Sequence, residues 1–435
     1  MNVILRSLLL LMVCLGGNAQ AALTIEITQG VKGAMPIAVV PFSWEGSMSA
    51  AAPLDIGAII TTDLHRSGRF SPLPERDMLA KPRDPAKVNF QNWSSLGVES
   101  LVVGSVRVLQ DNQYQVQFIL FDVFRAKQII GQTIHARSGT TDLRKTAHQI
   151  SDIIYEALLG ERGAFDTQIA YVTQAQDAAG KPRYSLQVAD ADGHSPSAIL
   201  NTSYPLMSPS WSPDGKKLAY VTFENGRPAI YTQHVRSGQR EKISSFKGIN
   251  GAPSWSPDGT QLALVLSKGG SPDIYVMDLL SKKLTRLTTS YAIDTEPVWT
   301  PRGDAIVFTS DRGGKPQLYQ VTLRGRQIKR LTFEGEYNAR ATLSPDGQLV
   351  GMVHGSGNRY RIAVLDLQTG AMQVLTDSVL DESPSFAPNG SMIIYATEHQ
   401  NRGVLSAVSV DGRVRQRLVL QEGEAREPVW SPYHR

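Results

Sequence analysis

The sequence has 435 residues and a nearly balanced charge, with 44 Lys and Arg against 40 Asp and Glu. A chain of this length is expected to form two or more domains. Basic residues form no run of five or more and are not interleaved with aromatic residues, so the composition speaks against a nucleic-acid-binding protein.

The first 21 residues have the pattern of an export signal. Arg6 supplies a positive charge, residues 7–15 form a short apolar core, and small residues at 19 and 21 precede a cleavage point that we place between Ala21 and Ala22. The apolar core is shorter than the roughly 20 residues that cross a bilayer, and no later stretch reaches that length, so we expect no membrane insertion. Cys14 is the only cysteine and leaves with the signal, so the mature chain is expected to lack disulfides.

The first residues of the mature chain alternate between apolar and polar side chains, which is typical of a strand. The segment comprises Ala22, Leu23, Thr24, Ile25, Glu26, Ile27 and Thr28. It has two interpretations: an edge strand of an N-terminal domain, or a segment that pairs with the sheet edge of a partner. Gly30 and Gly33 would allow it to detach.

Residues 22–160 predict a small α/β domain. A buried strand is expected at 36–42, a helix at 54–67, three strands at 101–109, 114–123 and 128–135, and a helix at 142–159 that ends at Gly160. Residues 160–165 have the character of a short linker.

A motif of the form Pro-x-Trp-Ser-Pro-Asp-Gly then recurs every 43 or 44 residues. Its large apolar residue falls at Trp211, Trp255, Trp299, Leu343, Phe386 and Trp430. A period of this length, with alternating strands between the motifs, is typical of four-stranded propeller blades. We therefore predict a six-bladed β-propeller over residues 161–435, with four antiparallel strands in each blade.

The two ends of the repeat region are out of phase. The region opens at Ile169 with a second strand that lacks a preceding Pro-x-Trp, and it ends at 428–430 with a Pro-x-Trp that lacks following strands. Unpaired sheet edges invite aggregation. We therefore expect the C-terminal strand to complete the blade that begins at Ile169.

The repeated residues have structural roles. Ser-Pro-Asp-Gly suits a tight turn, and the large aromatic residues are placed to fill the space between blades. Single aspartates in separate turns do not make a calcium site.

Sequence patterns of catalysis are missing. The chain has no Gly-x-Ser-x-Gly elbow, no phosphate-binding glycine loop and no pair of histidines at zinc-ligand spacing. We predict no catalytic residue, cofactor or metal, and a protein that is not an enzyme. The alternative is a small ligand or cation in the propeller channel, with hydrolysis as a further option, held by Asp294, Glu296, Asp381, Glu382 and Glu427.

Strand alternation divides the propeller into two ends. The Ser-Pro-Asp-Gly turns repeat at one end, whereas the loops that lead into the inner strands differ from blade to blade, which favours recognition there. The predicted partner-binding residues are Asn250, Gly251, Ala252, Asp294, Thr295, Glu296, Arg340, Asp381, Glu382 and Glu427. The alternative is that these residues only form turns.

The sequence resembles the TolB family, the periplasmic components of the Tol–Pal envelope system. The resemblance covers essentially the whole mature chain and is most specific at residues 205–231, 250–259, 271–279, 380–397 and 430–435. It implies a monomeric protein of the periplasm that binds TolA through the N-terminal segment and the lipoprotein Pal through a propeller face. It also implies support for outer-membrane integrity and for constriction during cell division, and use by colicins during their import.

Overall fold

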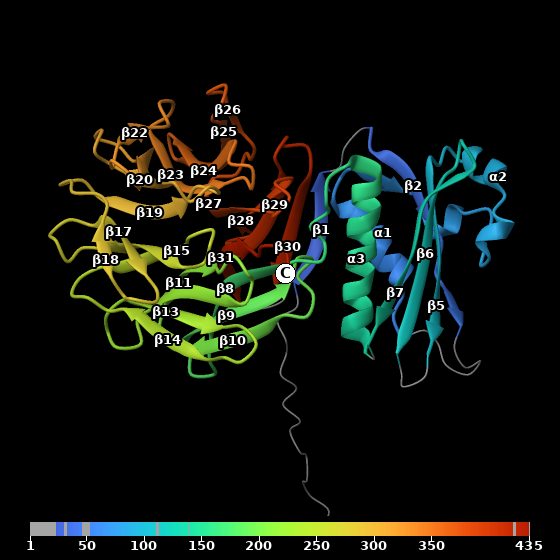
Figure 1. Cartoon of the computed structure of the whole chain (residues 1–435), viewed down its shortest axis with the longest axis horizontal. Coiled ribbons are helices and arrows are strands. Elements are labelled where there is room, and N and C mark those ends of the chain that lie inside the picture. Colours follow the sequence, from blue (N-terminus) through green and yellow to red (C-terminus); the bar gives the residue numbers. More distant parts are fainter. Residues whose placement is uncertain are drawn as a thin grey trace, which may run out of the picture.

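The computed structural model describes residues 23–29, 33–45, 53–109, 113–137, 139–420 and 423–434. The predicted export signal, with its cleavage point at Ala21 and Ala22, lies outside these residues. A small α/β domain packs beside a six-bladed β-propeller (Figure 1). Within the described ranges, no helix is long and apolar enough to cross a membrane.

The N-terminal domain is a mixed sheet with helices on both faces. Its elements are β2 (Met35–Val39), β3 (Ser43–Glu45), α1 (Ile56–Arg66), β4 (Phe70–Pro72), α2 (Phe90–Ser94), β5 (Ser100–Val108), β6 (Tyr114–Asp122), β7 (Lys127–Ala136) and α3 (Thr140–Leu159), with short 3-10 helices at Glu75–Asp77 and Pro85–Lys87. The strand order is β4-β2-β5-β6-β7, with β3 also on β5. β2 runs parallel to β4 and β5, whereas β5, β6 and β7 are antiparallel.

The long elements of this domain confirm the sequence prediction, and their ends have local causes. Asp55 caps α1 by accepting a hydrogen bond from the backbone N–H of Ala58 at 2.9 Å. α3 ends at Gly160, which takes the left-handed conformation at φ 78°. α1 and α3 bury one apolar face of the sheet, around Phe118, and α2 contributes Trp93 to the core on the other face.

Six sheets form the propeller, and each contains four strands from the repeat region. From the inner strand outward, blade 1 contains β31 (Glu424–Trp430), β8 (Gln168–Gln176), β9 (Pro182–Asp190) and β10 (Ser197–Thr202). Blade 2 contains β11 (Leu206–Trp211), β12 (Lys217–Thr222), β13 (Ala229–His234) and β14 (Arg240–Ser244). Blade 3 contains β15 (Asn250–Trp255), β16 (Gln261–Leu266), β17 (Asp273–Asp278) and β18 (Leu284–Arg286).

The second half of the ring has the same plan. Blade 4 contains β19 (Asp294–Trp299), β20 (Ala305–Ser310), β21 (Gln317–Thr322) and β22 (Ile328–Arg330). Blade 5 contains β23 (Tyr337–Leu343), β24 (Leu349–Ser356), β25 (Arg359–Asp366) and β26 (Met372–Val374). Blade 6 contains β27 (Asp381–Phe386), β28 (Met392–His399), β29 (Arg402–Ser409) and β30 (Arg415–Leu420).

The ring closes as the sequence predicts. The C-terminal strand β31 pairs antiparallel with β8, so that Trp430 lies opposite Ile169. The Trp430 indole N–H donates a hydrogen bond to Thr167 Oγ1 at 2.9 Å. The last strand of the chain therefore completes the first blade.

The tryptophans and turns have the structural roles expected from the repeats. The indole N–H groups of Trp255 and Trp299 each donate to a backbone carbonyl of the preceding inner strand, at 3.2 Å and 3.1 Å. In the first Ser-Pro-Asp-Gly turn, Asp214 accepts a hydrogen bond from the Ser212 hydroxyl at 2.6 Å, and the glycine has φ 68°. The aromatic residues thus tie neighbouring blades together while the turns reverse the chain.

Each inner strand contains a bulge just before its large apolar residue, and this explains the recurring proline. The ladder of β11 shifts register between Met207 and Ser210, and the other five inner strands shift at the equivalent position. A proline lies within five of these six bulges, where its missing N–H removes no ladder donor. The first residue of each bulge has positive φ, between 43° and 55°, and these residues are Ser208, Ala252, Glu296, Arg340, Ser383 and Glu427.

The N-terminal segment forms a strand, but it joins the propeller. β1 (Leu23–Gln29) pairs antiparallel with β30 as the fifth strand of blade 6, and Figure 1 shows it between the two domains. The interpretation of this segment as an edge strand of the N-terminal domain is therefore wrong. Alternation identifies a strand and its two faces, but it does not specify which sheet the strand joins.

Candidate partner-binding face

The two ends of the propeller differ in what covers them. We call the end that carries the Ser-Pro-Asp-Gly turns the turn face, and the end where loops lead into the inner strands the loop face. The N-terminal domain and the linker that follows it contact the turn face of blades 6 and 1, where Asn389 donates to the Arg162 carbonyl of the linker at 3.2 Å. The backbone of Gly68 lies so close to Val414 that a Cβ at this position would be 2.0 Å from a methyl group. The loop face carries the positions that the sequence analysis singled out.

The loop face opens into a central channel. A cavity of about 200 Å³ is lined by all six inner strands. The positive-φ residues of the bulges line it, and they comprise Ser208, Ala252, Glu296, Arg340, Ser383 and Glu427. The bulges therefore place these residues along the channel.

Arg340 bridges two carboxylates across this channel. Its Nε lies 3.0 Å from Glu296 Oε1, its Nη2 lies 3.4 Å from Glu427 Oε1, and its guanidinium also donates to Ser383 Oγ. Burial works against the charge on Arg340, but Glu427 and Glu296 outweigh it and hold the pKa of the guanidinium above its usual value. A cation in the channel would have to displace this arginine.

The five acidic residues suggested as channel ligands do not come together around one point. Asp294 and Asp381 are fully buried, whereas Glu382 is half-buried near the rim. Among the described residues, the only group of three potential metal ligands within reach of one another lies elsewhere, at Asp63, His148 and Asp192. The structure thus gives no geometric support to an acidic cation cage in the channel.

Three of the predicted partner-binding residues are buried supports of the loops. The Asn250 side chain donates to the Phe246 carbonyl at 2.7 Å and accepts from its backbone N–H at 2.9 Å. Asp294 accepts from Arg312 Nη2 through both oxygens, at 2.9 Å and 2.8 Å. Asp381 accepts a short hydrogen bond from Thr376, and burial raises its pKa. These side chains fix loop shape and do not present a surface to a partner.

The other seven predicted residues surround the channel mouth. Gly251, Ala252, Thr295, Glu296, Arg340, Glu382 and Glu427 are all half-buried at or beside the inner strands. A partner that entered the mouth would meet small, polar and charged groups there.

A ring of exposed apolar side chains on the loop face was not predicted from the sequence. Tyr291 is fully exposed and Phe333 is 74% exposed. We define the apolar ring as the exposed apolar residues of the leading loops together with Met207 at the start of β11. Its members are Tyr204, Met207, Phe246, Ile249, Tyr291, Ile293, Phe333, Val379 and Leu380. The sequence feature that could have predicted this ring is a large apolar residue in almost every leading loop. Exposed apolar groups gathered on one face mark interaction sites in soluble proteins.

The N-terminal segment occupies the edge of blade 6 through its backbone. Leu23 lies opposite Leu420 and Ile27 opposite Gln416, and the Glu26 carboxylate lies 3.6 Å from the Arg417 guanidinium. Ala22 lies outside the described residues. Because β1 ends the strand order of this sheet, its second edge has no strand partner within the described part of the chain.

Comparisons with known proteins agree along the whole chain. The profile of the TolB amino-terminal domain matches residues 23–129, and that of the TolB beta propeller domain matches residues 155–434. The chain is 65% identical to the Tol-Pal system protein TolB of Thioalkalivibrio sulfidiphilus, over 99% of this chain and 98% of that one, and 63% identical to that of Nitrosococcus oceani, over 95% and 94%. The crystal structure of TolB from Acinetobacter baumannii superposes with a TM-score of 0.87 at 42% identity, covering 94% of this chain and all of that one. The chain therefore belongs to the TolB family and is a component of the Tol–Pal system.

Proposed function

We propose that this protein is a non-catalytic scaffold of the periplasm that joins two other components of the Tol–Pal system. The loop face of the propeller binds the lipoprotein Pal, and the N-terminal segment binds TolA. This link supports outer-membrane integrity and constriction during cell division, and colicins exploit the protein during their import. Membership of the TolB family and the export signal support the proposed location and role.

The apolar ring around the channel mouth is the observation that carries the Pal assignment. It combines exposed aromatic groups with a half-buried polar centre, on the face that the N-terminal domain leaves open. Protein interfaces are enriched in aromatic side chains at their most buried positions. The charged groups in the channel are bonded to one another, which suits recognition better than catalysis.

The proposed TolA contact has to account for the docking of β1 on β30. A strand of TolA can add to the second edge of β1 while β1 stays docked. Alternatively, β1 leaves the propeller and a strand of TolA takes the place of β30 as its partner. In the second case TolA binding and β1 docking compete, so anything that stabilises docking lowers the affinity for TolA by the same factor.

Two substitutions on the loop face test the Pal assignment. Ala252→Arg fills the channel mouth with a charged group, and Tyr291→Ala removes a fully exposed ring that supports nothing in the fold. We expect each to weaken Pal binding by about 10-fold or more, equivalent to about 1.4 kcal/mol. Titration calorimetry with purified Pal measures the change.

A matched variant on the turn face controls for added charge. Gln348 is exposed there, so Gln348→Arg adds the same group as Ala252→Arg at the opposite end of the propeller. We expect unchanged Pal affinity. Normal affinity in both loop-face variants together with a loss in Gln348→Arg would assign Pal to the turn face instead.

A further inference from the structure

A buried cluster of charged groups joins the N-terminal domain to blade 1. Two members come from α1, two from α3, and two from the end of β9 and the turn that follows it. They are Asp63, Arg66, Arg144, His148, Asp190 and Asp192. Side chains as far apart in the sequence as Asp63 and Asp192 thus meet where the two domains touch.

His148 lies between carboxylates from both domains. Its Nδ1 is 2.7 Å from Asp63 Oδ2, and its Nε2 is 3.8 Å from Asp192 Oδ2. Only 2% of the residue is exposed. Asp63 also accepts from Ser151 Oγ at 2.9 Å and from Arg66 Nε at 3.0 Å, so the imidazole contacts a carboxylate that is held rigidly.

With all three carboxylates ionised, the charges of the cluster balance when His148 carries a proton on both nitrogens. Three carboxylates face two arginines, since Arg144 pairs with Asp192 and lies 3.5 Å from Asp190 Oδ2. An imidazolium brings the sum to zero, whereas a neutral imidazole leaves one negative charge in excess inside the interface. An uncompensated buried charge is strongly destabilising.

The groups around His148 favour its protonated form. Burial by itself lowers the pKa of His148, but Asp63 and Asp192 outweigh it, so the pKa lies above its usual value. Two further titratable groups flank the cluster: Asp152 on α3, whose pKa burial raises to about 6, and His194, two residues after Asp192. Burial and the adjacent Asp192 also raise the pKa of Asp190.

The cluster does not have the character of a metal site, although Asp63, His148 and Asp192 approach one another closely. The guanidinium groups of Arg66 and Arg144 already contact the two carboxylates. Two fixed positive charges beside the potential ligands oppose a further cation.

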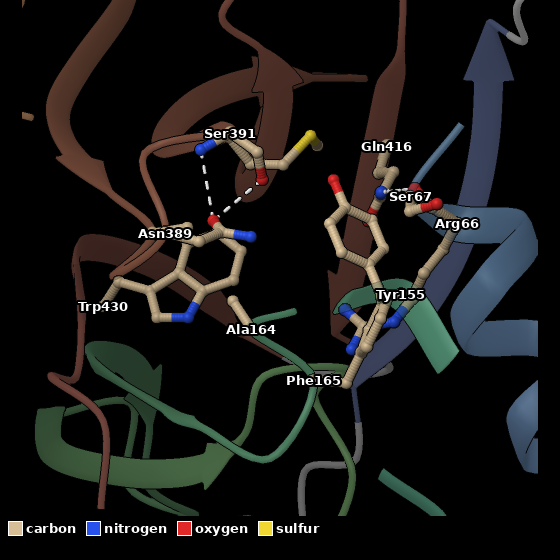
Figure 2. A pocket seen from close by; sticks show the side chains of 11 residues that line it. Arg66, Ser67, Tyr155, Ala164, Phe165, Asn389, Ser391, Gln416 and Trp430 are labelled. Atoms are coloured by element: carbon tan, nitrogen blue, oxygen red, sulfur yellow. Dashed lines mark hydrogen bonds between the residues drawn. The ribbon is translucent and has the colours of Figure 1, made fainter. Parts of the chain in front are cut away.

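Arg66 extends the cluster to the sheet on which β1 docks. Its backbone carbonyl accepts a hydrogen bond from the side chain of Gln416 in β30, and its guanidinium lies 5.1 Å from the centre of the Phe165 ring. Figure 2 shows Arg66 and Gln416 beside a cavity that also borders Tyr155 and Trp430. This cavity of about 30 Å³ has room for roughly one water.

We propose that this cluster is a proton-operated latch between the two domains. With His148 protonated, α1 and α3 are held against blades 1 and 6. Loss of the proton releases them, and release shifts the carbonyl that supports Gln416 beneath β1. The latch requires no partner protein, so its test is independent of the assignments of Pal and TolA.

The sign of the pH dependence follows from the direction of the shift. A histidine with a raised folded-state pKa contributes stability that is complete below its unfolded value of about 6.5. That contribution is lost as the pH rises through the folded-state value. The latch is therefore closed at mildly acidic pH and opens toward alkaline pH.

The distance between the domains tests the latch. Because Cys14 is the only cysteine and lies in the predicted signal, the mature chain accepts spin labels at introduced cysteines, such as Thr133→Cys on β7 and Lys242→Cys on β14. We expect double electron–electron resonance to give one narrow distance distribution near pH 5.5, and a broad one near pH 9, after the imidazole has titrated.

Two variants make the assignment specific. His148→Gln mimics the neutral ring and should give the broad distribution at every pH. Adding Asp192→Asn removes the excess negative charge, so the double variant should restore the narrow distribution and lose its pH dependence. Hydrogen exchange of β1, measured on the same samples, should rise whenever the distribution is broad.

Three outcomes would overturn the latch. The first is a wild-type distance that does not change with pH, and the second is a pH transition that persists unaltered in His148→Gln. The third is a rise in melting temperature on adding Zn²⁺ that the wild type shows and His148→Gln does not, which would assign the cluster to a metal. Circular dichroism checks that each variant is folded.

Discussion

Arg340 connects four blades at the level of single side chains. It lies in blade 5, and its guanidinium reaches Glu296 of blade 4, Ser383 of blade 6 and Glu427 of blade 1. Glu427 also accepts a hydrogen bond from the backbone N–H of Ser208 at 3.0 Å, which brings in blade 2. The channel is thus braced from side to side by a charged group.

Removing this brace should cost stability through the carboxylates it leaves behind. We expect Arg340→Ala to lower the free energy of unfolding by about 2 kcal/mol, as is typical for hydrogen bonds to charged groups. Urea denaturation followed by tryptophan fluorescence measures the change.

A neutralised channel is the control. Combining Arg340→Ala with Glu296→Gln and Glu427→Gln removes the unpaired charges, so most of the lost stability should return. If the triple variant is no more stable than Arg340→Ala, packing of the arginine stem and not charge is what the channel requires.

The residues that could be predicted from sequence are those with a local cause. Turn formers and the large aromatic residue recur at fixed spacing, so their roles between blades were predictable. His148 was not, because its partners Asp63 and Asp192 are distant in sequence and no motif joins them. Asn250 and Asp294 lie in predicted loops, but sequence could not reveal that their side chains point inward.

At the scale of elements, β1 has two edges with different partners. One edge meets β30, and the other ends the sheet. Because successive backbone N–H groups of a strand point to opposite sides, a proline at Ile25 and one at Glu26 remove donors from opposite edges.

A pair of proline variants therefore separates docking from partner binding. We expect one of Ile25→Pro and Glu26→Pro to raise hydrogen exchange of β1 and β30, and the other to leave docking intact. If TolA adds to the second edge, only the variant that preserves docking weakens TolA binding in calorimetry. If TolA replaces β30, TolA pairs with the same edge of β1 as β30 does. The variant that preserves docking should then bind TolA with unchanged affinity, and only the variant that undocks β1 should bind TolA differently. Unchanged TolA affinity in both variants would place the contact outside this segment.

Period and length explain which elements were predictable. Long amphipathic helices such as α3 and strands with regular alternation emerged from the sequence, whereas α2, β3 and β4 are too short to show a period. The strand nature of residues 23–28 was visible, but its pairing with a strand almost 400 residues later depends on tertiary structure.

At the scale of the whole molecule, ring closure joins the two ends of the propeller through β31 and β8. Deleting residues 426–435 removes most of β31 and the buried Trp430. We expect a loss of about 3–5 kcal/mol from the tryptophan alone, and self-association through the exposed edges. Thermal melting and light scattering measure the two effects.

Trp211→Ala separates packing from closure, since Trp211 is buried to a similar extent within an intact blade. This variant should lose comparable stability and remain monomeric. If the truncated chain is monomeric and has the same melting temperature as the Trp211→Ala variant, ring closure adds no stability beyond the packing of one aromatic residue.

The left-handed residues of the six bulges have an evolutionary consequence. The left-handed conformation costs a non-glycine residue about 1–2 kcal/mol, and the fold accepts that cost at the same position in every blade. Serine, alanine, glutamate and arginine all occupy this position, because its side chain lines the channel. Mutations there that keep the charges of the channel balanced can alter what the channel recognises without eroding the architecture, so partner preference is able to diverge between lineages while the propeller stays the same.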